Sequence, residues 1–313
     1  YIKIRVTNSC NAKCEMCWVI KRSLQFNDLN NLKKSILDFY KLWWEVVNLT
    51  WWEPTIYKWF WDLLKFSKDL WLFNSVSTNG STLWEKFFLN LYFEDKKLID
   101  YIDISIDWLN NLQDTRRKCK WLFKKIDDNL EFLIKNGINL HINVTIRKDN
   151  IWEMFDIFCY LKEKNINSIS FWMITSDPFF DRKDLYPEKE DLETFFLITK
   201  NSIIQNKNDI KVVFSPDYKW WNIDEFIDFI SNKNAFPKIE WNKCWFINSK
   251  KEIRINEWWD ITPCCILDDY DIKLWNINKN WLLNIICSEN YYDFLNRRFP
   301  YISKACLNCK LEV

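Results

Sequence analysis

The chain has 313 residues, a formal net charge of +1 and 48% hydrophobic residues. This composition excludes an intrinsically disordered chain and a binder of polyanions by bulk charge, so no nucleic-acid partner is expected. No apolar run approaches the roughly 20 residues that span a membrane, and the first residues lack the apolar segment of a signal peptide. We therefore expect a cytoplasmic protein without a membrane partner.

Glycine and tryptophan depart from normal composition in opposite directions. The chain contains two glycines and 21 tryptophans. Together they make up about 7% of the residues, which is close to the usual share of glycine alone. Translation of a stop codon as Trp, in a lineage that reads this codon as glycine, produces such an exchange. We therefore predict that most of these Trp positions are glycine in the native protein, with a truly Trp-rich chain as the alternative.

Short strand-like runs alternate with amphipathic segments of helix length, a pattern typical of βα units around a parallel sheet. The expected strands are 2–7, 45–50, 73–78, 101–107, 140–146 and 168–174. The expected helices are 29–42, 60–70, 83–92, 118–135 and 152–164. The sequence thus predicts an α/β protein with six βα units that form a partial TIM-like barrel.

The helix-to-strand junctions test the glycine hypothesis, because helices often end on a left-handed residue that only Gly or Asn adopts cheaply. Gly137 stands at such a junction. Trp71 stands at the equivalent place of another junction, as do Trp43 or Trp44 at a third. Tryptophan in this conformation costs on the order of 1 kcal/mol or more, which favours glycine at these positions.

After residue 174 the alternation of strands and helices stops, and a polar stretch leads through an expected helix near 190–205 to a Cys-rich end. Six of the 11 Cys lie in the last 70 residues. We expect a barrel over residues 1–175, a connecting region over 176–234 and a small Cys-rich module over 235–313.

Cys10, Cys14 and Cys17 follow the first expected strand and are spaced to wrap one metal cluster. Four-iron clusters normally take four thiolates, so three ligands leave one iron open to a small molecule. A structural zinc loop is the alternative, but tetrahedral zinc usually takes its ligands as two separated pairs, and the chain has a single histidine.

With this triplet in a loop after the first strand, the sequence resembles the radical SAM superfamily. The resemblance extends to Trp51-Trp52-Glu53-Pro54 at the end of the second expected strand, where the family has Gly-Gly-Glu-Pro. Glycine there lets backbone carbonyls approach the amino group of S-adenosylmethionine, with Glu53 as a further acceptor, whereas an indole blocks this approach.

The resemblance also implies cofactor contacts at later strand ends. Ser77 and Asn79 follow the third expected strand, and Ser105 and Asp107 close the fourth, where related proteins direct polar side chains at the ribose and methionine ends of the cofactor. Arg147 follows the fifth strand and is a candidate carboxylate clamp or a solvated surface residue.

Histidine and the remaining helical cysteines have simpler expected roles. His141 shares one strand face with Asn143 and is expected to be structural rather than a catalytic base. Cys119 and Cys159 are expected on helices as small buried hydrophobes.

The C-terminal module resembles the Twitch and SPASM modules of radical SAM proteins. Reading Trp259 as Gly gives their Gly-x4-Cys element, which ends at Cys264. The implied ligands of one auxiliary four-iron cluster are Cys244, Cys264, Cys306 and Cys309, with Cys265 as a substitute for Cys264. A zinc site is the structural alternative, and a truncated SPASM module with a second cluster would use the last two cysteines differently.

The resemblance implies an oxidoreductase or maturase that holds a [4Fe-4S] cluster and cleaves S-adenosylmethionine reductively to a 5′-deoxyadenosyl radical. This radical abstracts hydrogen from the substrate, which we expect to be a peptide or protein. A flavodoxin or ferredoxin is the implied electron donor. The alternatives are radical oxidation of a small molecule such as a sugar or aminocyclitol, and a metal-binding protein without catalysis.

Overall fold

The computed structural model describes 17 N-terminal residues, most of the chain between 26 and 173, and short segments beyond. The described residues are 1–17, 26–83, 90–93, 96–173, 183–185, 187–188, 190–191, 193–195, 197–199, 210–215, 253–256, 260–262, 275–277, 279 and 282–289. The four C-terminal cysteines of the predicted auxiliary site, Cys244, Cys264, Cys306 and Cys309, lie outside them. Among the described residues, no helix is both long enough and apolar enough to cross a membrane.

The core of the molecule is one ten-stranded, mainly parallel sheet with the order β12-β11-β10-β1-β2-β3-β6-β7-β8-β9. Its strands are β1 (Ile2–Ile4), β2 (Val46–Leu49), β3 (Phe73–Thr78), β6 (Tyr101–Ser105), β7 (Asn139–Ile146), β8 (Ser168–Met173), β9 (Lys211–Ser215), β10 (Ile253–Ile255), β11 (Asp260–Thr262) and β12 (Trp275–Asn276). A separate small hairpin pairs β4 (Tyr92–Phe93) with β5 (Lys96–Lys97). The predicted α/β fold with a parallel sheet is confirmed.

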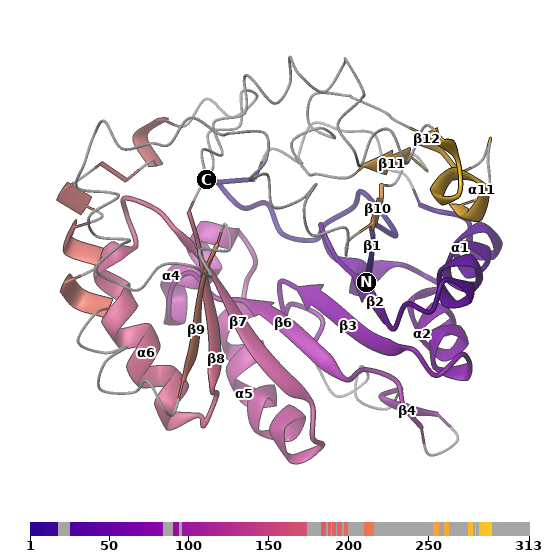
Figure 1. The fold of residues 1–313 in the computed structure, drawn as a ribbon. Helices are drawn as coiled ribbons and strands as arrows, with labels where there is room; N and C mark the ends of the chain where they lie inside the picture. Colours follow the sequence, from indigo (N-terminus) through magenta and orange to yellow (C-terminus); the bar gives the residue numbers. More distant parts are fainter. Residues whose placement is uncertain are drawn as a thin grey trace.

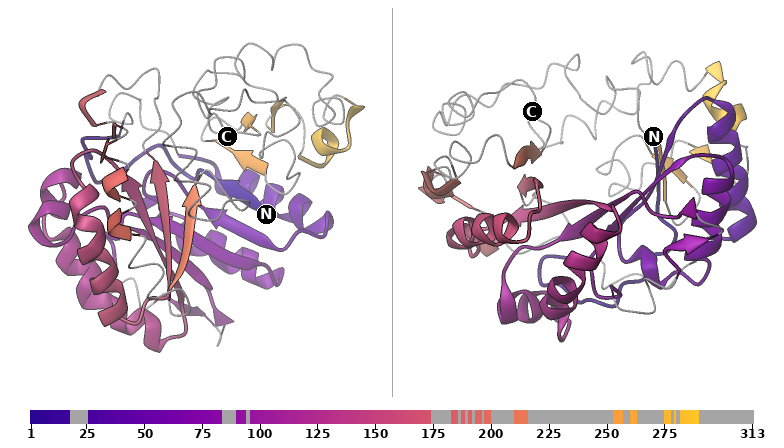
Figure 2. Two further views of the ribbon diagram at one scale, coloured as in Figure 1. Left: turned by 60° about the vertical axis from the view of Figure 1, so that its left-hand side comes forward. Right: turned by 90° about the horizontal axis from the view of Figure 1, so that it is seen from below.

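Helices cover the outer face of the curved sheet (Figures 1 and 2). They are α1 (Leu29–Lys41), α2 (Phe60–Asp69), α4 (Asn110–Arg117), α5 (Leu122–Lys135), α6 (Met154–Glu163) and α11 (Leu282–Ile286), with 3-10 turns η2 (Pro54–Ile56), η3 (Ile151–Glu153) and η4 (Lys183–Leu185). Helix α1 shows why they pack there. The Asp28 side chain caps its first turn, and Leu32, Ile36 and Phe39 form the buried stripe at helical spacing.

Two of the predicted helices differ from expectation. The segment expected as a helix over 83–92 falls largely outside the described residues, and its end at Tyr92 is a strand. The helix expected over 118–135 begins only at Leu122, because Lys118 takes a left-handed conformation that ends the preceding helix α4. Helix α4 was not predicted.

The sheet continues beyond the six predicted strands on both sides. Strand β9, from the expected connecting region, pairs in parallel with β8. Strand β10, from the expected Cys-rich module, pairs in parallel with β1 and begins an antiparallel hairpin with β11. Segments far apart in the sequence therefore share one sheet, and α11 lies beside α1 at this edge (Figure 1).

Four helices end in the same local structure, in which a left-handed residue directly follows the helix cap. These residues are Trp43 after α1, Trp71 after α2, Gly137 after α5 and Asn165 after α6. In the last three, the next residue donates its N–H to a carbonyl in the final turn, as in a Schellman motif. Two of the four positions carry the expected Gly or Asn, and two carry Trp.

Candidate active site

The three N-terminal cysteines lie on one loop that follows β1. Cys14 is buried, whereas Cys10 and Cys17 are half-buried, and none of the three is in a disulfide with another described cysteine. The Cys17 N–H donates to the Cys14 carbonyl at 3.1 Å, which closes the last turn of the loop. The sequence prediction of three thiols on one loop after the first strand agrees with this arrangement.

The first half of this cysteine loop is held by the ends of β2 and β3. The Glu53 N–H donates to the Ser9 carbonyl at 3.2 Å. Asn79, just after β3, donates its side-chain amide to the Asn11 side chain at 3.0 Å and lies 3.6 Å from the Cys10 sulfur. The Ala12 N–H is directed at the same sulfur at 3.4 Å. Two N–H donors thus face Cys10, and such donors stabilise a thiolate more than a thiol.

The second half of the loop rests on the C-terminal end of α4. The Lys13 and Glu15 N–H groups donate to the carbonyls of Arg117 and Arg116 at 3.1 and 3.2 Å. The Arg116 guanidinium also pairs with the Glu15 carboxylate at 3.1 Å. Carbonyls of the last helical turn have no partner within the helix, so the loop satisfies two of them.

Burial favours the protonated form of two thiols of this loop, those of Cys10 and Cys14. Burial raises the pKa of Cys10 to about 11, and the Ala12 N–H opposes this shift. Burial also raises the pKa of Cys14, where the nearby Arg117 charge lowers it and the Asp107 charge raises it. A metal centre therefore has to displace these protons when it binds.

Three thiols on one short loop, with N–H donors directed at one sulfur, suit a cluster that takes three thiolates and leaves one iron open. Within the described residues, no three His, Cys, Asp or Glu side chains converge on a site for a single metal ion.

Glu53 lies at the end of β2 and is completely buried. Its carboxylate accepts hydrogen bonds from the Asn79 N–H at 2.8 Å, from the Thr78 hydroxyl at 2.7 Å and from the N–H and hydroxyl of Thr55. Burial raises its pKa, and these donors oppose the shift. Glu53 thus ties the end of β2 to the end of β3, and its carboxylate is already occupied by protein donors.

Trp51 and Trp52 precede Glu53, and both have left-handed backbones, with φ of 68° and 48°. The Trp51 ring lies over the Arg5 guanidinium at 3.7 Å and contacts the Trp52 ring edge-on. Buried Pro54 then begins the turn η2. The backbone at this strand end has the conformation that glycine favours, and indole rings occupy the space beside it.

Asp107 and Arg147 are buried, and their polar groups are engaged by the protein. One Asp107 oxygen accepts the Thr145 N–H at 2.7 Å, and the other pairs with Arg117 at 2.5 Å. Arg147 makes a two-pronged pair with Asp149 at 2.8 Å and directs a third nitrogen at the Met16 sulfur at 3.2 Å. Arg147 is therefore not a solvated surface residue; it contacts the cysteine loop between Cys14 and Cys17.

On the concave face of the sheet, sequence reasoning named Ser77 and Ser105 but missed Asp103. In β6, Asp103 and Ser105 alternate with Ile102 and Ile104, which are buried in the core under the helices. The Ser77 hydroxyl donates to Asp103 at 2.9 Å, and burial raises the pKa of this carboxyl to about 6. The strict alternation in 101–105 was the available signal.

His141 lies opposite Asp103 in the paired strand β7. Its Nδ1 is 2.7 Å from the Ser168 hydroxyl. Burial and the Lys211 charge lower its pKa to about 4. A neutral, hydrogen-bonded imidazole agrees with the predicted structural role.

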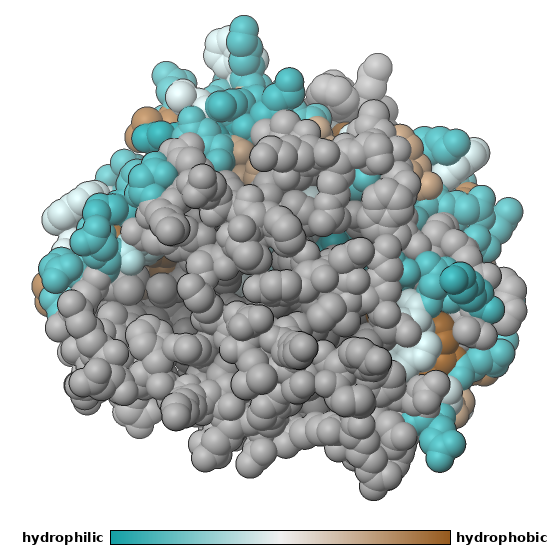
Figure 3. Space-filling view, turned by 90° about the horizontal axis from the view of Figure 1, so that it is seen from above, coloured by the Kyte–Doolittle hydropathy of each residue, from teal (hydrophilic) through white to brown (hydrophobic). Residues whose placement is uncertain are grey.

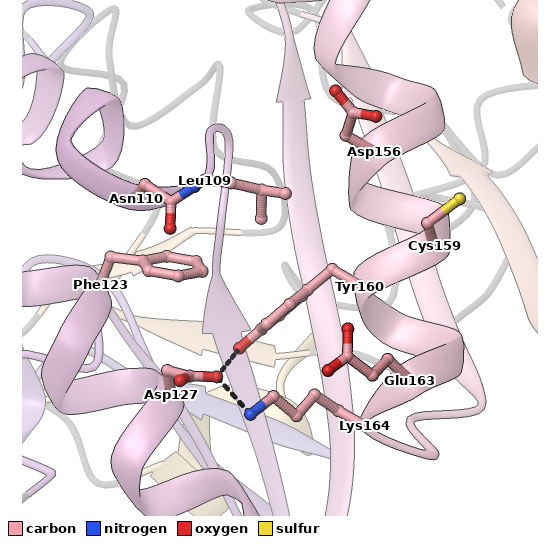
Figure 4. Close-up of a pocket in the computed structure, with 9 residues that line it drawn as sticks. All are labelled: Leu109, Asn110, Phe123, Asp127, Asp156, Cys159, Tyr160, Glu163 and Lys164. Atoms are coloured by element: carbon pink, nitrogen blue, oxygen red, sulfur yellow. Dashed lines mark hydrogen bonds and ion pairs between the residues drawn. The ribbon is translucent and has the colours of Figure 1, made fainter.

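Two further features lie outside this site. A cavity of about 350 Å³ opens between α5 and α6, lined in part by Asp127, Tyr160 and Lys164, and it includes none of the predicted site residues (Figure 4). Cys159 on α6 also lines it and is exposed, so the prediction that this cysteine is buried was wrong. The face turned upward in Figure 1 has mainly hydrophilic described side chains along its rim (Figure 3).

A curved parallel sheet with an outer helical layer and a three-cysteine loop after its first strand defines a partial TIM barrel with a cysteine site at its rim. Residues 4–161 match the sequence profile of the Radical SAM superfamily. This is half of the chain, and the protein belongs to that superfamily, whose members are enzymes that use a [4Fe-4S] cluster and S-adenosylmethionine.

The chain is also similar to one curated protein and to solved structures. Fe-coproporphyrin III synthase of Methanosarcina barkeri is 26% identical over 171 residues, which are 53% of this chain and 42% of that protein. The match thus spans less than half of that relative. The structure of SuiB from Streptococcus suis bound to S-adenosylmethionine has a TM-score of 0.73 at 16% identity, over 99% of this chain and 70% of SuiB. The structure of anSMEcpe with bound AdoMet and a peptide has a TM-score of 0.67 at 16% identity, over 99% of this chain and 85% of that one.

Proposed function

We propose that this protein cleaves S-adenosylmethionine reductively and uses the resulting 5′-deoxyadenosyl radical to abstract hydrogen from a peptide or protein substrate. The observation that carries the proposal is the cysteine loop, which the ends of β2, β3 and β7 and the last turn of α4 hold in place. When bound, the cluster and its cofactor supply the electron and the radical, and the barrel directs them.

Cys10, Cys14 and Cys17 hold the cluster in this proposal. The strand end at 51–54 contacts the cofactor through its backbone, and Ser77, Asn79 and Ser105 line the neighbouring strand ends. Glu53, Asp107 and Arg147 support the residues that contact the cofactor in this proposal, because each has its charged group engaged by protein partners. These three side chains fix the strand ends and the loop that a ligand meets.

Similar structures favour a peptide substrate. SuiB has been solved with the precursor peptide SuiA, and anSMEcpe with two different peptides. The name of the curated relative refers instead to a porphyrin, so oxidation of a small molecule is the second candidate. An electron donor of the flavodoxin or ferredoxin type and a cytoplasmic location complete the proposal.

The C-terminal region holds an auxiliary four-iron cluster of the Twitch type in this proposal, on Cys244, Cys264, Cys306 and Cys309. The hairpin of β10 and β11 lies between the first two of these cysteines in the sequence and is attached to the barrel through β1. The proposed barrel, connecting region and module cover 1–175, 176–234 and 235–313. Iron content that falls by half when Cys306 and Cys309 are replaced by serine would support it, and an unchanged content would contradict it.

Glycine at most Trp positions is part of the same proposal. Among the described residues, five of the eight non-glycine residues with positive φ are Trp: Trp43, Trp51, Trp52, Trp71 and Trp121. Left-handed backbone disfavours every residue with a Cβ, and Asn tolerates it best. Peptide sequencing of native material across 42–58 reads four of the suspect positions directly, and indole at all four would contradict this part.

The test of the function is 5′-deoxyadenosine formation from S-adenosylmethionine under anaerobic reduction. The chain as written is compared with a chain that carries glycine at the suspect Trp positions, both after iron and sulfide reconstitution. We expect product from the glycine chain, and loss of that product in its Cys14→Ala variant. A glycine chain that holds a four-iron cluster but forms no 5′-deoxyadenosine would refute the function.

A further inference from the structure

The cysteine loop packs on the C-terminal end of helix α4, which is electrostatically unfavourable for a negatively charged cluster. The carbonyls of Arg116 and Arg117 in the last turn of α4 accept the Lys13 and Glu15 N–H groups, and the Arg117 carbonyl oxygen lies 4.0 Å from the Cys14 sulfur. The C-terminal end of a helix carries partial negative charge. A four-iron cluster on three thiolates is itself an anion and becomes more negative on reduction. Something at this helix end has to offset the repulsion.

Arg117 is the buried positive charge at this place. Its side chain is 7% exposed, whereas the neighbouring Arg116 side chain is 35% exposed and pairs with Glu15 and Asp149. Arg147 is the other buried guanidinium near Cys14, but both prongs of its fork bind Asp149. Arg117 binds a single carboxylate, that of Asp107.

Arg117 also has a donor left over. Its Nε is buried and has no hydrogen-bond partner among the described residues. A buried N–H without a partner is rare and needs an explanation. The thiolate and sulfide sulfur atoms of a metal-loaded cysteine loop are hydrogen-bond acceptors for such an N–H.

We infer that Arg117, oriented by Asp107, is the charge partner of the cluster on the cysteine loop and sets how easily this cluster is reduced. The inference rests on the proposed function. Arg117 and Asp107 are positioning residues, because the Asp107 carboxylate is engaged by the Arg117 guanidinium and the Thr145 N–H. Hydrogen bonds to sulfur and nearby charges are the protein's means of tuning a cluster.

Charge-removing substitutions of Arg117 and of Asp107 are expected to shift the midpoint potential of the cluster in opposite directions. Replacing Arg117 with Gln removes a positive charge beside the cluster, so reduction becomes harder and the midpoint potential falls. Replacing Asp107 with Asn removes a negative charge and leaves Arg117 in place, so the midpoint potential rises. Both substitutions break the same ion pair, and a purely structural role would therefore shift both variants in the same direction.

The experiment is an EPR-monitored redox titration of the reconstituted chain with glycine at positions 51 and 52, alongside its iron and sulfide content. Since loss of one partner from a buried pair often unfolds a protein, Arg117→Lys is included. It keeps the charge, and we expect it to stay close to the parent potential. Lys124→Gln removes an exposed pair on α5 and serves as the control with an unchanged potential.

The inference is overturned if Asp107→Asn retains its iron and does not raise the potential, or if both charge-removing variants shift the same way. Should Arg117→Gln fail to take up iron, the Asp107→Asn and Arg117→Lys results still decide. A parent chain that takes up no four-iron cluster contradicts the proposed function as well. A parent with a normal cluster and unshifted variants contradicts only the role of Arg117.

Discussion

Replacing three exposed tryptophans with glycine should stabilise the protein. Trp43, Trp71 and Trp121 have φ of 60°, 61° and 61°, and their side chains are 93%, 88% and 67% exposed. A left-handed backbone costs a residue with a Cβ roughly 1–2 kcal/mol, and glycine gives back about 0.5–1 kcal/mol through the greater entropy of its unfolded chain. Each site therefore gains about 0.5–1 kcal/mol, and the three sites, at the ends of different helices, together gain about 2 kcal/mol.

Urea unfolding followed by circular dichroism measures this gain without relying on tryptophan fluorescence, which the substitutions themselves change. The matched control is Trp152→Gly, because Trp152 is 73% exposed in the turn η3 and is not among the left-handed residues. It should lose about 1 kcal/mol through glycine propensity alone. A triple variant with a lower urea midpoint than the parent would refute the argument that these positions are strained.

Four other predictions test the site and its surroundings. Glu53→Gln places amide hydrogens against buried donors and should lower the free energy of unfolding in urea by about 2 kcal/mol. An unchanged urea midpoint would contradict the hydrogen bonds of the Glu53 carboxylate. Burial raises the pKa of Asp103 to about 6, so the folded chain holds a proton that the unfolded chain has released. Parent stability should fall by up to about 3 kcal/mol between about pH 4 and pH 6, and Asp103→Asn should remove this slope. Iron content should drop in Cys14→Ser and stay at the parent level in the exposed-site variant Cys159→Ser; equal losses would count against the loop. Gly80 has φ +80°, and the Cβ of Gly80→Ala would lie 2.5 Å from the Ile126 side chain of α5, so this substitution should lower the free energy of unfolding by about 1–3 kcal/mol. An unchanged urea midpoint would show instead that α5 shifts freely to admit the methyl group.

The sequence predicted the elements whose burial pattern is regular. The strand expected over 73–78 is β3, and the helix expected over 29–42 is α1 to within a residue, with Leu32, Ile36 and Phe39 as its buried stripe. Helix α4 has only two buried residues, the polar Gln113 and Arg117, and therefore shows no apolar period. Strand β10 has three residues, too few for any alternation, and it is specified by its pairing with β1 from the far end of the chain.

The residues of the candidate site also differ in whether local sequence could predict their role. The three cysteines were found because all of their spacing is local. The partners of the charged strand ends are not local, since Arg147 contacts Met16 and Glu53 binds Thr78 and Asn79 on another strand. A carboxylate or guanidinium at a strand end therefore signals a site, but only the fold decides whether it meets the ligand or braces the residues that do.

Strand β6 and its extension show how one segment serves both purposes. Asp103 and Ser105 face the concave side of the sheet, where Asp103 is bound by Ser77 from β3. Two residues after β6 ends, the side chain of Asp107 instead pairs with Arg117 under the cysteine loop. One short segment of the chain therefore supplies a polar group to the concave face of the sheet and, just beyond its strand, the carboxylate that binds Arg117 next to the cysteine loop.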